Sequence, residues 1–450
     1  MNETKPVTAP PSAPPVFGAV VAPIQAFFRL EAASGIVLLA CALGALAWAN
    51  LGGVDSYRAV FEASFTLVIG RAVAHFTLLQ LVNDGLMTVF FFVVGMEIKR
   101  ELVDGELRTL PQAMLPAIAA LGGMIVPALL YLAFNRGGPG RPGWGIPMAT
   151  DIAFCIGVLT ILRARVPRAL IVFVTALAIF DDIGGILVIA LFYGHGIDAA
   201  WLVAAAGLTL GLVAMTRAHV RSGVLWAAAG AALWTALHHA GIHATIAGVV
   251  LGLAIPARTR RPLGAVLDAL ARHAAHLAHG REDAERQGAE VLAIEEALEE
   301  VEAPLTRFVH ALHPWVAFGI MPLFALANSG VHVAGLDPSQ LTGRVAVGTA
   351  LALFVGKQVG IFAFSLAAVK LGVGSLPRDT TLPKLFGASI VAGIGFTVAL
   401  FIATLAFAGT PALLDEAKVG ILAASLAAGL VGGGVLRLTR RVEARDARGR

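Results

Sequence analysis

The stretch ALAIFDDIGGILVIALFY, residues 176–193, places two adjacent aspartates, Asp181 and Asp182, in the middle of a long apolar run. A charged side chain at the centre of a membrane helix costs about 2.5–3.5 kcal/mol even on permissive scales. Ionisable groups in such places face the interior of a helix bundle or a water-filled cavity, and they mark function. The stretch therefore predicts a transmembrane helix that carries two functional acids.

The composition of the whole chain indicates a membrane protein. Of its 450 residues, 58% are hydrophobic and 14% are charged, whereas a soluble domain carries about 25% charged residues. The mean hydropathy is +0.81. These values exclude a soluble globular protein, a disordered chain and a nucleic-acid binder, although the formal net charge is +4. The two cysteines, Cys41 and Cys155, lie in apolar stretches, so we expect no disulfide framework.

Twelve apolar segments are long enough to be candidate spans, and glycine and proline punctuate most of the gaps between them. We therefore predict an all-α polytopic membrane protein. An even number of spans puts both termini on one side. Basic residues gather in alternate loops and in the tail, which makes that side cytoplasmic. The predicted spans are 33–51, 78–98, 111–134, 145–162, 169–193, 197–215, 222–238, 242–256, 312–330, 345–369, 384–408 and 415–436.

The pattern also divides the chain into membrane and non-membrane regions. We expect the N-terminus to be proline-rich and disordered, then interfacial, and to carry no cleaved signal peptide. Between the two groups of spans we expect a charged cytoplasmic insertion with some helix. After the last span we expect a basic cytoplasmic tail. The insertion is either a solvated charged segment or a regulatory, pH-sensing one. The predicted regions are 1–32, 33–256 (spans 1–8), 257–311 (the insertion), 312–436 (spans 9–12) and 437–450.

The paired aspartates suit proton binding. Neighbours on a helix point about 100° apart, so one carboxylate can face a cavity while the other faces a partner helix. Two close carboxylates titrate as a coupled pair. At least one of Asp181 and Asp182 can therefore take up and release a proton.

Two further charges lie in mid-span. Asp151 follows Gly145 and Pro147 in GWGIPMATDIAFCIGVL (143–159), and it can either neutralise the positive ends of two half-helices or ligate an ion. Lys357 lies mid-way along the tenth span. A buried lysine needs an anion or must lose its proton, so we expect it to pair with one of the two adjacent aspartates.

Two spans have glycine or proline in positions that break a helix. The fourth is weakened near its start by GIP, and the eleventh is interrupted near its middle by GIGF (393–396). Spans 3–5 and 10–12 thus form corresponding halves with a discontinuous middle helix. This arrangement is typical of transporters built from inverted repeats.

The residues favour ion transport over other functions. Paired carboxylates without a cysteine or histidine cluster suit a hard cation or protons, so Asp181 and Asp182 could hold sodium or lithium. Competition between cation and proton, combined with alternating access, is sufficient for exchange, and no cofactor is needed. A sodium-coupled solute symporter is the alternative, although few other polar groups line the predicted core. An intramembrane enzyme with a DDxxD motif is disfavoured because Gly185 occupies the last position.

Seven stretches together resemble the NhaA-type sodium/proton antiporters of bacterial inner membranes. The resemblance implies twelve helices, two inverted repeats and a pH-regulated, electrogenic exchange, in which two protons enter as one sodium or lithium ion leaves. It also suggests a homodimer. The matching stretches are NDGLMTVFFFVVGMEIKREL (83–102), IPMATDIAF (146–154), ALAIFDDIGG (176–185), GIHATIAG (241–248), LHPWVAFGIMPLFALANSGV (312–331), GKQVGIF (356–362) and GIGFT (393–397).

The resemblance also implies roles for single residues. Asp182 is the principal cation ligand and proton carrier, and Asp181 is the partner of Lys357. Asp151 compensates the charge of the crossed half-helices, and Thr150 is a neighbour of the cation.

A second group is implied to act in ion entry and pH response. Asp84 belongs to a cytoplasmic funnel, and His243 is either tied to pH response or a structural histidine. One departure is Val309, where the family carries an acidic residue implicated in pH response. The charges at the inner end of the second span are either a pH-sensing group or ordinary cytoplasmic anchors: Glu97, Lys99, Arg100 and Glu101.

Overall fold

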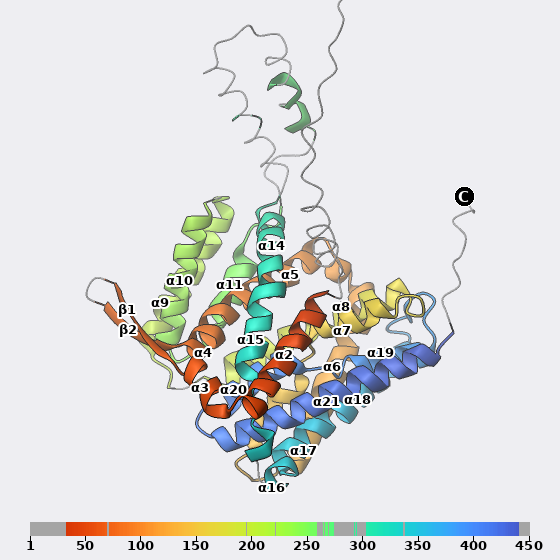
Figure 1. The fold of residues 1–450 in the computed structure, drawn as a ribbon. Helices are drawn as coiled ribbons and strands as arrows, with labels where there is room; N and C mark the ends of the chain where they lie inside the picture. Colours follow the sequence, from red (N-terminus) through yellow and green to blue (C-terminus); the bar gives the residue numbers. More distant parts are fainter. Residues whose placement is uncertain are drawn as a thin grey trace, which may run out of the picture.

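In a computed structural model the chain folds into a bundle of long helices (Figure 1). The structure describes residues 33–69, 72–194, 196–220, 222–258, 303–335 and 338–440, together with a few residues between 264 and 294. The predicted segment 1–32, most of the predicted insertion and the last ten residues lie outside this part of the chain.

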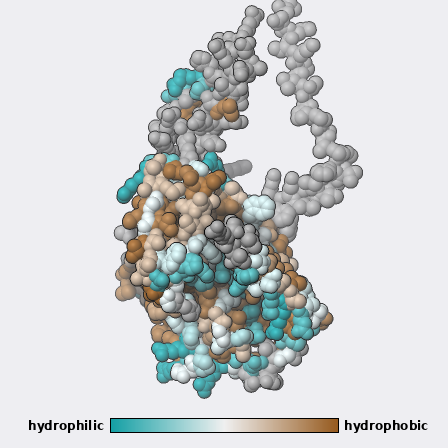
Figure 2. All heavy atoms as spheres, turned by 90° about the vertical axis from the view of Figure 1, so that its left-hand side faces the viewer, coloured by the Kyte–Doolittle hydropathy of each residue, from teal (hydrophilic) through white to brown (hydrophobic). Residues whose placement is uncertain are grey.

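The helices confirm the predicted helical membrane fold. Within the described residues, nine helical segments are long and apolar enough to cross a membrane, or ten when a bent pair is counted as one span. Figure 2 shows broad hydrophobic patches on the outside of the bundle, and on helix α9 (Ala199–Arg217) Val203 and Leu210 are more than two-thirds exposed. In water such a surface would be unfavourable, whereas in a bilayer it contacts lipid.

Two predicted spans are shorter than the other spans. The seventh corresponds to α10 (Gly223–His239), which has 17 residues, and the eighth to α11 (Ile246–Ala254), which has nine. A straight helix of nine residues reaches only about half-way across a bilayer core. The count of twelve spans therefore stays a prediction.

The segment between the first two spans contains the strands, which the sequence analysis did not predict. Helix α2 (Ala33–Leu51) and the short α3 (Val54–Phe61) are followed by β1 (Ser64–Ile69) and β2 (Ala72–Thr77). The two strands pair antiparallel, from Ser64 opposite Thr77 to Ile69 opposite Ala72. Both six-residue segments are rich in β-branched and aromatic residues, which favour a pleated strand.

The second span is continuous with the hairpin. It comprises α4 (Leu78–Gln80), a π-helical turn η1 (Leu81–Leu86) and α5 (Met87–Val103). A 3₁₀ turn, η2 (Glu106–Arg108), then leads into α6 (Leu110–Phe134).

A close crossing of two helices, α6 and α18 (Lys357–Lys370), fixes the position of Lys357. Helix α6 packs along α18, and a Cβ atom added at either Gly122 or Gly360 would overlap the backbone carbonyl of the other glycine. Small residues allow this close approach of two membrane helices. Because Lys357 lies one turn before Gly360, the crossing fixes its position in the bundle.

The fourth and eleventh spans are both broken, as predicted. The fourth consists of a 3₁₀ segment, η3 (Arg141–Met148), and α7 (Ile152–Ile161), joined by non-helical residues. The eleventh consists of α19 (Leu382–Val391) and α20 (Phe396–Ala406), bent by 44° at the break. The intact helix α8 (Arg168–Phe192) lies beside them.

The remaining helices complete the bundle. In Figure 1 the long C-terminal helix α21, at the blue end of the chain, runs beside α17 and α19. Two further π-helical turns, η4 and η6, interrupt the ninth and tenth spans. The bounds are α14 (Pro304–Trp315), η4 (Val316–Ile320), α15 (Met321–Asn328), η5 (Val333–Gly335), α16 (Pro338–Leu341), α17 (Arg344–Leu351), η6 (Ala352–Gly356) and α21 (Pro411–Leu438).

Candidate ion-binding site

A buried ion pair lies at the centre of the bundle. The Nζ atom of Lys357, on α18, is 2.9 Å from Oδ2 of Asp181, on α8, and neither side chain has exposed surface. Lys357 also donates a hydrogen bond to the backbone carbonyl of Met148, at the end of η3. Because that carbonyl lies at the break of the fourth span, the lysine ties the broken helix to the aspartate helix.

The break of the fourth span supplies further polar groups to this pair. The hydroxyl of Thr150 lies 2.7 Å from Oδ2 of Asp181 and 3.1 Å from the carbonyl oxygen of Ala392, which belongs to the other break. A hydroxyl and exposed backbone carbonyls beside a carboxylate are the oxygen ligands that hard cations prefer. The structure thus brings Thr150, Asp181 and both breaks together.

Asp151 joins the two broken helices. One of its carboxylate oxygens accepts a hydrogen bond from the backbone N–H of Phe154 at 3.1 Å and caps the start of α7. The other accepts bonds from the Thr397 N–H at 3.1 Å and the Thr397 hydroxyl at 2.5 Å, at the start of α20. The Asp151 N–H donates to the carbonyl of Ile394 at 2.7 Å. A carboxylate between two helix N-termini fits charge compensation.

Asp182 has a different environment from its neighbour. Its side chain is buried, and its Oδ1 atom has no hydrogen-bond partner among the described residues, as is also true of Oδ1 of Asp181. Unpartnered buried oxygens are rare in proteins, and each calls for an explanation. Two such atoms on adjacent carboxylates could receive a cation or protons. No group of three or more histidine, cysteine, aspartate or glutamate side chains suited to a metal occurs in the described chain.

Asp84 lies beside His243. It belongs to the π-helical turn η1, and its Oδ1 atom is 3.8 Å from Nε2 of His243, whose other ring nitrogen contacts the Thr245 hydroxyl at 2.9 Å. The two predicted residues are therefore close to each other.

The predicted pH-response group lies at the end of α5. Oε1 of Glu97 is 3.5 Å from Nδ1 of His313 on α14, and the Lys99 ammonium donates to the carbonyl of Ile255 at 2.5 Å. Arg100 and Glu101 are 4.0 Å apart. Val309, the departure from the family pattern, is buried.

Two residues with prominent contacts were not singled out from the sequence. Thr397 is the last residue of the quoted GIGFT stretch, and its position just after the break indicates a capping role. His313 follows Leu312 in the quoted LHPW stretch. Only the packing of α14 against α5 shows its contact with Glu97.

This geometry defines a class of protein. Two broken membrane helices that cross beside buried carboxylates and a lysine are the arrangement of a multi-pass secondary transporter with its site near the middle of the bundle. The chain belongs to the Na+/H+ antiporter 1 family, whose model matches residues 25–436.

Curated relatives agree over nearly the whole chain. A Na(+)/H(+) antiporter NhaA from Anaeromyxobacter sp. (strain Fw109-5) is 64% identical and covers 99% of this chain and 98% of its own. Na(+)/H(+) antiporter NhaA 1 from Myxococcus xanthus is 55% identical, and the match covers 98% of this chain and 99% of that protein. The solved structure of the sodium proton antiporter MjNhaP1 from Methanocaldococcus jannaschii has 12% identity and a TM-score of 0.50 over 93% of this chain and 99% of its own, which shows a similar fold.

Proposed function

We propose that the protein extrudes sodium, or lithium, in exchange for two protons per cation by alternating access. The observation that carries this proposal is the Lys357–Asp181 ion pair beside Asp182, whose buried Oδ1 atom has no hydrogen-bond partner among the described residues. Membership of the antiporter family supports the choice of sodium and protons.

The proposed cycle uses competition at one site. A cation binds the carboxylates of Asp182 and Asp181, assisted by the Thr150 hydroxyl and the carbonyl groups of the two breaks. Binding requires both carboxylates to be ionised, and it displaces Lys357 from Asp181, so that the lysine releases its proton. After the site opens to the other side, one proton binds Asp182 and a second binds Lys357, which pairs with Asp181 again as the cation leaves.

This cycle moves charge across the membrane. One monovalent cation leaves as two protons enter, so a net positive charge moves inward in each cycle. The membrane potential would then drive extrusion together with the proton gradient, and the cycle needs no cofactor besides the transported ions.

We place the protein in the bacterial inner membrane with both termini in the cytoplasm, because the basic loops fall on that side. In this orientation Asp84 lines a cytoplasmic funnel with His243. The group around Glu97, Lys99 and Glu101 regulates the exchange by pH. A homodimer is the proposed oligomeric state.

The decisive experiment is a proton-flux assay in proteoliposomes with sodium, lithium and potassium added separately across a range of pH. We expect proton movement with sodium and lithium and none with potassium. A potassium-valinomycin clamp that varies the membrane potential should change the rate, because the exchange is electrogenic. Sodium-driven uptake of an organic solute without proton counterflow would instead establish the symporter, and an exchange insensitive to the potential would contradict the two-proton stoichiometry.

A further inference from the structure

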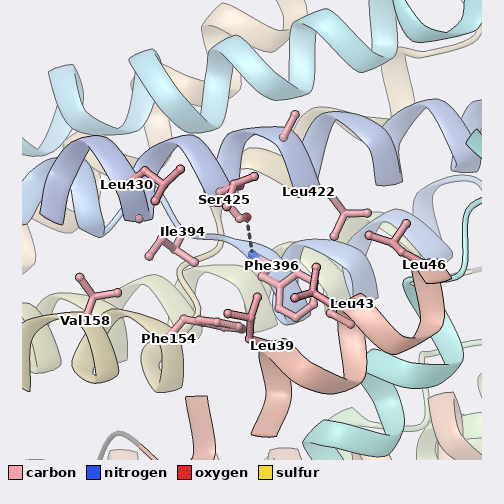
Figure 3. Close-up of a pocket in the computed structure, with 14 residues that line it drawn as sticks. Leu39, Leu43, Leu46, Phe154, Val158, Ile394, Phe396, Leu422, Ser425 and Leu430 are labelled. Atoms are coloured by element: carbon pink, nitrogen blue, oxygen red, sulfur yellow. Dashed lines mark hydrogen bonds between the residues drawn. The ribbon is translucent and has the colours of Figure 1, made fainter. Parts of the chain in front are cut away.

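An apolar groove lies on the outer side of the helix crossing. Its cavity has a volume of about 420 Å³, and it is bounded by α2, α7, α21 and the segment that joins α19 to α20 (Figure 3). We name it the crossing groove. The residues that line it include Leu39, Leu43, Phe154, Ile394, Phe396, Ser425, Gly429 and Leu430.

The lining excludes a polar or charged occupant. Ser425 carries the only polar side chain among the residues that line the groove. Its hydroxyl oxygen accepts a hydrogen bond from the backbone N–H of Phe396 at 3.3 Å, as Figure 3 shows. The described lining residues include no charged group to bind an ion or a lipid headgroup, and water gains no hydrogen bonds on an apolar wall.

The groove is continuous with the lipid-facing surface. Its rim residues Leu43 and Leu430 are 57% and 68% exposed, and both lie on helices long enough to span the membrane. A groove that opens sideways from such helices opens into the hydrocarbon of the bilayer. The hydrocarbon layer of the bilayer therefore supplies an apolar occupant, namely a lipid acyl chain.

We propose that one acyl chain of a membrane phospholipid occupies the crossing groove. The volume lies within the roughly 300–1,000 Å³ of pockets that hold small ligands. The groove is therefore too large to be filled by the side chains that line it. An empty cavity of this kind would forfeit the dispersion contacts of its lining. The headgroup remains outside the groove, so we expect selection by the chain and not by the headgroup.

The floor of the groove gives this chain a structural role. Ile394 lies in the break of the eleventh span, and Phe396 is the first residue of α20. The carbonyl of Ile394 accepts the N–H of Asp151, and Thr397, which binds the Asp151 carboxylate, follows Phe396 directly. The acyl chain thus packs against one side of the unwound segment while Asp151 holds the other. It supports the non-helical backbone between α19 and α20.

One glycine makes the proposal testable. A Cβ atom at Gly429 would meet only the Cδ1 atom of Ile394, at 3.7 Å, so a leucine there can extend into the groove without striking the backbone. Gly434, on the same helix, has no atom within 4 Å of its added Cβ and does not line the groove. Gly434→Leu is therefore the matched control for Gly429→Leu.

The experiment reconstitutes the full-length protein with a phosphatidylethanolamine that carries a diazirine in its acyl chain. After illumination, peptide mass spectrometry locates the adducts. We expect adducts on the floor residues Ile394 and Phe396 in the unmodified protein and in Gly434→Leu. They should fall several-fold in Gly429→Leu, while adducts on the outward-facing residues of other spans stay unchanged.

Two results would overturn the proposal. One is labelling confined to outward-facing residues, with none on the floor of the unmodified protein. The other is equal floor labelling in the two leucine variants. If Gly429→Leu does not fold, Ala423→Leu on the exposed wall of the groove replaces it, because this alanine also lines the cavity. The same loss of floor adducts is then required.

Discussion

The ammonium group of Lys357 lies 2.9 Å from Oδ2 of Asp181 although neither side chain has exposed surface. The two residues come from helices α18 and α8, and both of these helices pack against α6. A buried ion pair has little net stabilising value compared with apolar residues, whereas the loss of one partner is severe. The pair is therefore better explained by a role in the transport cycle than by stability.

This relationship predicts a non-additive effect on stability. Lys357→Met and Asp181→Asn should each destabilise the protein, by up to about 3–5 kcal/mol, because each leaves an uncompensated buried group. The double variant should lose much less than the sum of the two single variants. The midpoints of thermal unfolding in detergent would measure this coupling.

Lys370→Met is the matched control for the lysine, because Lys370 is an exposed residue at the end of the same helix α18. It should leave the unfolding midpoint nearly unchanged. Additive losses in the double variant would show that the two groups do not interact in the folded protein.

Asp182→Asn should abolish sodium-dependent proton flux while the protein still folds and inserts. Asparagine keeps the shape of the side chain but removes its negative charge and its ability to carry a proton. The measurement is the proteoliposome assay above, with the amount of inserted protein determined separately. Asp379→Asn serves as the control, because Asp379 is exposed and has a positive φ of 58°, which asparagine tolerates. Undiminished flux in Asp182→Asn would reject the assigned site.

Thr397→Val should weaken the crossing of the broken helices. Valine has the same shape but lacks the hydroxyl that donates to Asp151 at 2.5 Å, so a buried carboxylate oxygen loses a donor. We expect a loss of roughly 1–3 kcal/mol in stability and a lower exchange rate.

Thr404→Val is the matched control on the same helix, since the Thr404 hydroxyl donates only to the Phe401 carbonyl of its own helix. Thermal unfolding and flux should both remain close to those of the unmodified protein. Equal effects of the two threonine changes would contradict a special role for the Asp151 contact.

His313→Asn should alter the pH dependence of exchange. His313 attracts Glu97 as an ion only while its imidazole is protonated, so this interaction is lost as the pH rises through the titration of the imidazole. Removing it should change the pH profile measured with saturating sodium, with a smaller effect on the maximal rate. His219→Asn, at an exposed position with φ of 53°, should leave the profile unchanged. A profile unaffected by His313→Asn would exclude the ion pair as a regulator.

Much of the fold could be predicted because its signals are local. The first span, 33–51, was predicted with the bounds that α2 has. The breaks at GIP and GIGF were visible because glycine and proline act on their own neighbourhood. The hairpin from Ser64 to Thr77 was missed, because two short apolar strands between spans resemble a connecting loop.

The site was harder to predict, since its contacts join distant parts of the chain. Mid-span aspartates and a lysine are evident from the cost of burying charge. The residues alone left open which aspartate receives Lys357 and whether Asp151 compensates charge or ligates an ion. Neither the capping contact of Thr397 nor that of His313 with Glu97 follows from the spacing of residues.

The sequence by itself thus determined that this is a helical membrane protein with buried ionisable groups and two interrupted spans, because hydropathy and helix breaking depend on neighbouring residues. Only the tertiary structure decided that Lys357 contacts Asp181, that Asp151 caps two half-helices, and that an apolar groove opens beside their crossing. Those features depend on how closely helices approach, as at Gly122 and Gly360. Distances between helices are set by the packing of the whole bundle.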